Sequence, residues 1–345
     1  MEKRRVEWID TAKFLGIFAI YLGHYDPYAG LWKDFVFSYH VPLFFFISGC
    51  MDTYDRYSIR TYLYKKCKSI LFPFWGFAIL SIIIAVIVKD MSFTGIKLCL
   101  VALGYGCIRG TFFAESLWFL SALFVMEIVF KMIKQSGKKW IMLVISAALF
   151  IFSSYFVSEA SGMELKHFYN WDWALFYLIY FAIGYCVYPS LCKWLLLDSK
   201  EKKISFLIVF LITAFIAALV FEKKTYISDH LADYSQLNEL FIVIRTLVLI
   251  LFNLLLARAL SGVRCLSNAG RETLFLCGNE YVVKTIAPGV LSLLGISLHY
   301  KNPLSVFICV AALISINIKW IIPFEKEAVR SIKACFFSGE DSAAL

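Results

Sequence analysis

The chain has 345 residues, of which 61% belong to the hydrophobic set and 17% are charged, and its mean hydropathy is +0.74. Soluble domains average roughly 45–50% apolar and about 25% charged residues, so this composition excludes a soluble globular protein. The net charge of +9 would suggest a nucleic-acid partner in a soluble protein. In so apolar a chain we attribute it to membrane topology, and no nucleic acid is expected.

Apolar blocks of membrane-spanning length recur along the whole chain and predict an all-α, polytopic transmembrane helical bundle. The segment 94–113 has a short apolar core and four glycines, so we expect a surface or re-entrant helix there and not a further span. One integral membrane domain is expected over 1–324, followed by a short cytoplasmic tail, 325–345. About ten spans are expected, at 10–27, 35–51, 69–88, 116–134, 139–157, 172–190, 204–222, 239–260, 272–293 and 304–324.

Lysine and arginine are distributed unequally between the segments that connect these spans. With the N-terminus in the cytoplasm, the inner segments carry 23 of these residues and the outer segments carry 8. Cytoplasmic loops of membrane proteins carry an excess of Lys and Arg, so both termini are expected in the cytoplasm. The pattern predicts a multi-pass protein of the cell (inner) membrane, of bacterial type.

The first expected span carries three ionisable residues in an apolar stretch, DTAKFLGIFAIYLGH (residues 10–24). A helix turns about 100° and rises about 1.5 Å per residue, so Lys13 and His24 lie within roughly 20° of each other and about 16 Å apart along the axis. Asp10, Ile17 and Ile20 share this face. Ionisable residues at membrane depth are costly and usually functional, so we expect the face to line a cavity, with Lys13 near the cytoplasm and His24 towards the outside.

The second expected span begins with SYHVPLFFFISG (residues 38–49) and places His40 a short way below the outer surface. A short connection makes the first two spans antiparallel neighbours, which puts His40 at a depth similar to that of His24. For each histidine the alternative to a role in the cavity is an interfacial position, in which its side chain reaches water.

Five stretches together resemble the acyltransferase-3 family of integral membrane acyltransferases, and are most similar to its fucose 4-O-acetylase-like branch. The first fifty residues carry the most specific part of this resemblance. In relatives the motif of the penultimate span often ends in histidine, whereas this chain has Asn279 and Glu280 there. The stretches are WIDTAKFLGIFAIYLGH (8–24), YHVPLFFFISG (39–49), KKCKSILFPFW (65–75), SLWFLSALF (116–124) and GRETLFLCGNEY (270–281).

The resemblance implies acyl transfer, most readily of acetyl, from cytoplasmic acyl-CoA to a hydroxyl of a cell-surface polysaccharide or its precursor. His24 and His40 are the expected catalytic residues, with His24 as general base, because a positioned histidine is the usual activator of a hydroxyl. Direct transfer and an acyl-His24 relay both stay open. Acyl-CoA is expected as a co-substrate, with no tightly bound cofactor. The residues expected to hold its phosphates are Lys13, Lys65, Lys66 and Lys68, with Asp10 either fixing Lys13 or capping the helix.

Five further residues are candidate contacts for the saccharide or lipid-linked saccharide acceptor, each with a structural alternative. Glu115 could be a helix-start acid, and Trp118 an interfacial aromatic residue. Arg245 could serve only to pair with Glu280, and Glu280 could also form an i,i+4 pair with Lys284. Glu127 carries the same ambiguity, and no metal site is expected because the histidines lack ligand spacing. The five candidates are Glu115, Trp118, Arg245, Asn279 and Glu280.

The rival function is a multi-span transporter or flippase of a cell-envelope precursor, since polar groups at depth suit transport as well. Paired broken helices in corresponding halves would favour transport, and the sequence shows no such pattern. A membrane sensing domain ranks last. The sequence leaves open the acceptor, the acyl chain and a homodimer.

Overall fold

The computed structural model describes residues 6–25, 28–52, 57–106, 116–155, 167–196, 199–224, 227, 235–293, 295 and 302–328. Within these ranges the protein is all-helical, as predicted, and no strand is present. The α-helices are α1 (Glu7–Gly23), α2 (Leu31–Phe37), α3 (His40–Met51), α4 (Ile59–Lys66), α5 (Phe72–Lys89), α6 (Phe93–Gly104), α7 (Trp118–Ile133), α8 (Lys139–Ser154), α9 (Trp171–Phe176), α10 (Leu178–Trp194), α11 (Lys200–Glu222), α13 (Ser235–Ala259), α14 (Arg264–Arg271), α15 (Thr273–Gly278), α16 (Glu280–Leu293) and α17 (Pro303–Ile316). Two π-helical turns, Cys67–Leu71 and Asn317–Ile321, continue α4 into α5 and extend α17.

Helices occupy all ten predicted spans, but ten membrane crossings are not confirmed. Five helical stretches in the described part of the chain are long and apolar enough to cross a bilayer, or six if the α9–α10 pair counts as one bent span. The predicted first span shows why the number falls, because α1 has 17 residues and a crossing takes about 20. The five stretches are Leu31–Met51, Ile59–Val88, Lys200–Glu222, Leu237–Ala259 and Pro303–Ala328.

The uncertain segment 94–113 begins with α6, which has 12 residues. At about 1.5 Å per residue such a helix is much shorter than the hydrocarbon core, so α6 does not cross the membrane alone. This agrees with the expected surface or re-entrant helix, although residues 107–115 lie outside the described residues.

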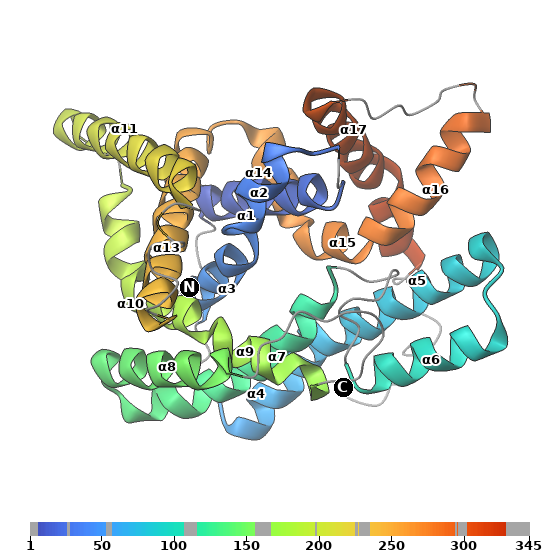
Figure 1. Ribbon diagram of the computed structural model, residues 1–345, viewed down its shortest axis with the longest axis horizontal. Coiled ribbons are helices and arrows are strands. Elements are labelled where there is room, and N and C mark those ends of the chain that lie inside the picture. Colours follow the sequence, from blue (N-terminus) through green and yellow to red (C-terminus); the bar gives the residue numbers. More distant parts are fainter. Residues whose placement is uncertain are drawn as a thin grey trace, which may run out of the picture.

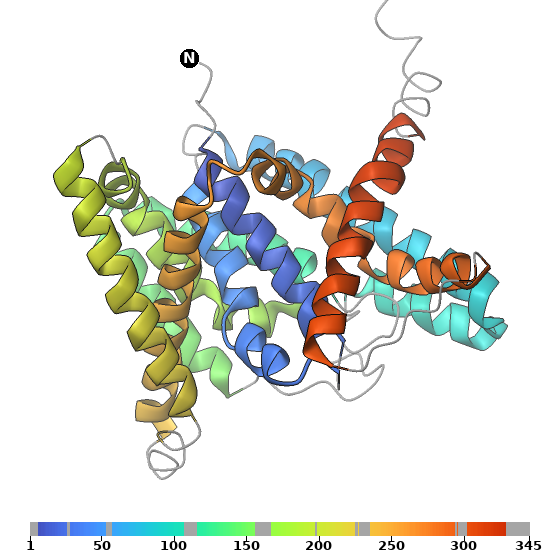
Figure 2. The same cartoon turned by 90° about the horizontal axis from the view of Figure 1, so that it is seen from above.

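Helices α1 and α3 lie between two outer groups, and the short, largely exposed α2 connects them (Figure 1). One group contains α10, α11 and α13, and the other contains α5, α6 and α16. The start of α1 and the end of the last helix lie on the same side of the molecule (Figure 2). That this side faces the cytoplasm stays a prediction. The last helix runs to Ala328, past the predicted domain boundary at 324, and residues 329–345 of the predicted tail lie outside the described residues.

Two glycines bring α3 and α10 into close contact. A Cβ atom at Gly49 would lie 2.0 Å from the Phe181 carbonyl oxygen, and one at Gly184 would lie 2.2 Å from the Phe46 oxygen. Small residues at helix interfaces allow backbones in membranes to approach in this way. The crossing fixes α3, and with it His40, against the rest of the bundle.

A third glycine joins the first helix to α14. A Cβ atom at Gly270 would lie 1.7 Å from the Asp10 carbonyl oxygen, so only glycine permits this contact between α14 and α1. The contact places the end of α14 beside the stretch of α1 that carries Lys13.

Candidate active site

The face of α1 that was predicted to line a cavity does so. The cavity has a volume of about 260 Å³ and is walled by α1, α3, α7, α14 and α15. Its lining includes four of the five positions of the predicted stripe, Lys13, Ile17, Ile20 and His24. The helical period therefore places a cation and an imidazole along one chamber, about 16 Å apart along the α1 axis.

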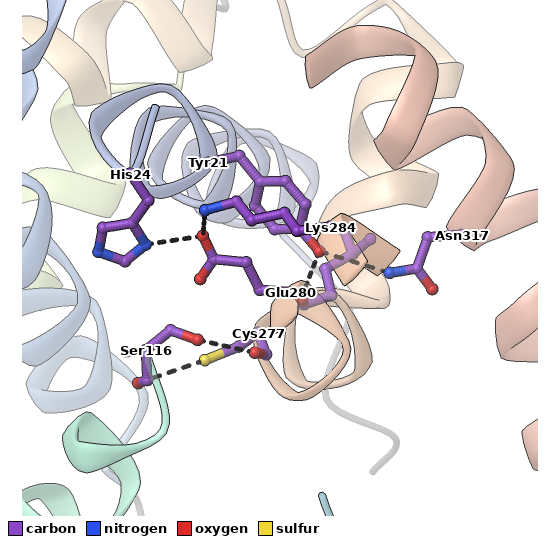
Figure 3. Close-up of polar contacts among 8 residues, drawn as sticks. Tyr21, His24, Ser116, Cys277, Glu280, Lys284 and Asn317 are labelled. Carbon is purple, nitrogen blue, oxygen red and sulfur yellow. Dashed lines mark hydrogen bonds and ion pairs between the residues drawn. The ribbon is translucent and has the colours of Figure 1, made fainter. Parts of the chain in front are cut away.

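Glu280 lies beside His24 and joins it to Lys284 (Figure 3). The distance from His24 Nδ1 to Glu280 Oε1 is 2.7 Å, and the distance from Lys284 Nζ to the same oxygen is also 2.7 Å. The Glu280 side chain is 3% exposed. An ionised carboxylate only accepts hydrogen bonds, so Nδ1–H of His24 donates and the basic nitrogen of the ring is Nε2, on the opposite side. The i,i+4 pair of Glu280 and Lys284 is confirmed.

A break in the helix places Glu280 at this position. Helix α15 ends at Gly278, and Glu280 begins α16, so one residue, Asn279, connects the two. The Asn279 amide donates to Glu325 Oε2 at 2.7 Å and to Asn317 Oδ1 at 3.2 Å. This buried network gives the connecting residue a structural role, and its predicted acceptor contact stays a prediction.

Tyr21 ties the same break to α1. Its hydroxyl donates to the Leu276 carbonyl oxygen at 2.7 Å and accepts from Asn317 Nδ2 at 3.4 Å. Leu276 lies in the last turn of α15, so the bond holds the end of that helix one turn from His24 on α1. The pair of His24 and Glu280 is therefore set by packing of three helices.

His40 shares the cavity with His24, as expected from their similar depth. Its Nδ1–H donates to the Val36 carbonyl oxygen at 2.7 Å, and the side chain is buried. The Phe37 ring contacts both imidazoles, with centroid distances of 6.0 Å to His24 and 4.9 Å to His40. Both histidines thus have Nδ1 engaged by an acceptor, which makes Nε2 the basic nitrogen in each.

Arg271 lies at the Lys13 end of the cavity and was not singled out from the sequence. It lines the chamber, and its Nε is 3.7 Å from Asp10 Oδ2. The alternative that Asp10 caps the helix is wrong, because α1 begins at Glu7 and Asp10 lies within it. The sequence did contain a signal for Arg271, because it belongs to the stretch GRETLFLCGNEY that carries the family resemblance. In the sequence analysis it was used only as one of the positive charges of the inner segments.

Trp118 on α7, Cys277 on α15 and Ser116, two residues before α7, also line the cavity. The Ser116 hydroxyl donates to the Cys277 carbonyl oxygen at 2.9 Å, and the Cys277 thiol donates to the Ser116 carbonyl oxygen at 3.7 Å. Trp118 lines the cavity, which is the position that a contact with the acceptor requires. The contact itself stays a prediction. Glu115 lies outside the described residues.

Four further candidates lie elsewhere in the bundle, because Lys65, Lys66, Lys68 and Arg245 are outside the set of residues that lines the cavity. Lys66 is buried in an ion pair with Glu127. The pair gives the Glu127 carboxylate a structural role in the bundle. Lys65 lies over the Tyr57 ring at 3.6 Å. Their predicted roles with donor and acceptor stay predictions. Within the described ranges no group of three or more His, Cys, Asp or Glu side chains is placed to hold a metal ion.

One known protein family matches most of this chain. The acyltransferase domain of the acyltransferase-3 family matches residues 6–276, which include α1, α3, α7, α14 and most of α15. Glu280 and Lys284 lie beyond the matched segment. No curated protein and no solved structure matches the chain. The matched segment covers well over half of the chain and carries both histidines of the cavity, so the protein belongs to the acyltransferase-3 family and is an acyltransferase.

Proposed function

We propose that this acyltransferase is an O-acetyltransferase of the bacterial inner membrane. It moves an acetyl group from cytoplasmic acetyl-CoA to a hydroxyl of a cell-surface polysaccharide or its lipid-linked precursor. The observation that carries the proposal is one chamber with Lys13 and Arg271 at one end and the two histidines, His24 and His40, at the other. A CoA thioester has the matching shape, with phosphates at one end of a narrow arm and the acyl group at the other.

In the proposed reaction His24 acts as general base. The acceptor hydroxyl loses its proton to Nε2 of His24 as its oxygen bonds to the thioester carbonyl carbon. The carbon–sulfur bond then breaks, and the CoA thiolate takes the proton from the imidazolium. Glu280 holds Nδ1–H throughout, which fixes the tautomer and orientation of the ring, as the carboxylate of a serine-protease triad does.

His40 is proposed to orient the reacting groups. Its ring is held by the Val36 carbonyl, so Nε2 has a fixed position in the cavity wall. A buried imidazole in a fixed orientation can bind the acceptor hydroxyl or the thioester at little entropic cost. Trp118, on the α7 wall, offers an aromatic face for a sugar ring.

The dimensions and charges of the chamber support acetyl-CoA as the donor. At about 260 Å³ the cavity is near the lower end of ligand-pocket sizes, roughly 300–1,000 Å³, which favours a short acyl group. The cations Lys13 and Arg271 suit phosphate oxygens, and arginine binds them in bidentate fashion. The CoA phosphates can therefore stay near the inner surface while the thioester reaches His24.

The rival function, transport of an envelope precursor, draws on one observation. Helices α9 and α10 are bent by 57° at Tyr177, and broken helices are common in transporters. A transporter needs no general base and does not consume acetyl-CoA, so the two functions differ in their use of the donor.

The test is His24→Ala in purified protein supplied with acetyl-CoA and cell-envelope glycans. General bases typically contribute about 10²–10⁴-fold, so CoA release should fall by that factor while the protein stays folded. His167→Ala is the matched control, because His167 contacts Trp171 and does not line the cavity. Full activity of the His24→Ala variant would remove the proposed mechanism.

A further inference from the structure

The three groups Lys284, Glu280 and His24 form a chain in which a nitrogen atom of Lys284 and one of His24 contact the same carboxylate oxygen. Oε1 of Glu280 receives both contacts, each at 2.7 Å, whereas Oε2 is buried without a hydrogen-bond partner in the described part of the chain. The carboxylate is therefore almost fully removed from water, and both of its partners lie on the side of Oε1.

A base in the resting enzyme has to be neutral, and this requirement creates an electrostatic problem. If His24 is neutral, Glu280 alone would be a buried anion, and an isolated buried charge costs several kcal/mol. Without another cation the cheaper arrangement is an ion pair, in which the carboxylate 2.7 Å from Nδ1 holds His24 as the imidazolium. That arrangement removes the base.

Lys284 solves this problem because it brings a permanent positive charge to the carboxylate. Its ammonium is held in place by aromatic faces, 4.9 Å from the Tyr25 ring centroid and 6.0 Å from that of Tyr21. Such cation–π contacts fix the position of the ammonium group. The other titratable groups around the pair are Tyr21 on α1, Tyr25 two residues after α1, His40 on α3, Cys277 on α15 and Glu325 on the last helix. None of these carries a permanent positive charge.

We propose that Lys284 is a positioning residue that compensates the charge of Glu280, so that Glu280 stays ionised while His24 stays neutral and able to take a proton. This inference rests on the proposed role of His24 as base. During the reaction the proton passes from the acceptor hydroxyl to His24, and Lys284 and Glu280 neither gain nor lose one. The net charge of the three groups changes from zero to plus one, and then returns to zero when the thiolate is protonated.

The decisive experiment measures the neutral imidazole directly, without acyl transfer. Diethyl pyrocarbonate acylates neutral histidine and not the imidazolium, and peptide mass spectrometry reports each site separately. In Lys284→Met the rate of acylation at His24 should fall about tenfold relative to the rate at His40, a change equivalent to about 1.4 kcal/mol. His40 is the internal reference because its rate reports access of the reagent to the same cavity. Lys284→Arg should react as the wild type does, because arginine retains the charge.

Two controls separate this role from a merely structural one. Lys319→Met removes a lysine that lies over Trp320 and contacts neither member of the pair, so it should leave the rate unchanged. In a Glu280→Gln background, Lys284→Met should have no further effect, because no carboxylate charge is left to compensate. If Lys284→Met does not fold, Lys284→Gln provides the neutral variant. An unchanged rate at His24 in a folded neutral variant overturns the proposal.

A kinetic arm links the same residue to catalysis. Lys284→Met should lower kcat with an unchanged KM for acetyl-CoA, and Lys284→Arg should restore most of kcat. A change confined to KM would contradict the positioning role. Failure of the wild-type protein to transfer acetyl would count against the proposed function alone, since the labelling rates at His24 still decide the role of Lys284.

Discussion

His24 and Glu280 are 256 positions apart in the chain, yet their side chains form the central contact of the site. The stripe on α1 could be predicted because positions 13, 17, 20 and 24 are related by the local period of one helix. The partner of His24 could not, because it depends on how α15 and α16 pack against α1. Glu280 was singled out from the sequence, but as an acceptor contact or as a partner of Arg245 or Lys284, and not as a partner of the imidazole.

Arg271 shows the same limit. The sequence assigned the donor phosphates to Lys13 and to the cluster Lys65, Lys66 and Lys68, because these are basic and near the expected inner surface. The structure places Lys66 in a buried ion pair with Glu127 and brings Arg271 to the cavity. The local period of α1 predicted that Lys13 faces the chamber, but the position of Arg271 depends on long-range packing of α14 against α1, which no local pattern carries.

Replacement of Arg271 by Gln should weaken the binding of acetyl-CoA and leave that of a donor without nucleotide phosphates unchanged. Loss of one charge-assisted phosphate contact costs roughly 1.5–3 kcal/mol, so KM for acetyl-CoA should rise about tenfold or more. Acetyl-pantetheine lacks the nucleotide phosphates, and its KM should stay as in the wild type. Steady-state kinetics with both donors measure the difference. An equal rise for the two donors would mean that Arg271 supports the fold or the thioester end, and not the phosphates.

At the scale of elements, the positions of helices could be predicted but their breaks could not. The stretch 272–293 was expected as one span, and the structure divides it at Asn279, where the buried contacts to Asn317 and Glu325 hold the connecting residue. Apolar composition does not distinguish a continuous helix from two helices with a buried polar joint, because the joint is stabilised by residues from elsewhere in the chain.

The crossing of α3 and α10 provides a test at this scale. Gly184→Ala would bring a Cβ to the backbone oxygen of Phe46, at 2.2 Å, so the helices have to move apart. Overpacking of this kind costs typically about 1–3 kcal/mol, and the unfolding temperature of the purified protein should fall. Gly104→Ala is the matched control, since a Cβ there meets no atom within 4 Å. Equal unfolding temperatures for the two variants would contradict the close crossing.

For the whole molecule, composition was sufficient to predict an all-helical membrane protein, because apolarity is a property of the entire chain. The number of crossings was less secure, since α1, α7 and α8 have 17, 16 and 16 residues, shorter than a typical span. The two ends of the described chain lie on one side of the bundle, which agrees with an even number of crossings (Figure 2).

The orientation of the bundle can be tested at the two ends of one helix. Helix α11 runs from Lys200 to Glu222 and is long and apolar enough to cross the membrane. The charge asymmetry places Lys200 inside and Lys223 outside. In intact cells an impermeant thiol reagent should label Lys223→Cys and not Lys200→Cys, and in inverted vesicles the pattern should be exchanged. The opposite pattern in intact cells would reverse the predicted topology.

We propose that this acyltransferase moves acetyl from cytoplasmic acetyl-CoA to an envelope glycan by way of His24. The most direct measurement supplies acetyl-labelled CoA to the cytoplasmic face of inverted vesicles, which is the outer face of such vesicles, with glycan acceptor enclosed. Label should appear in the glycan with the wild-type protein and with His167→Ala, and should be lost with His24→Ala. Glycan that moves across the membrane without gaining label, or label transfer that persists without His24, would contradict the account.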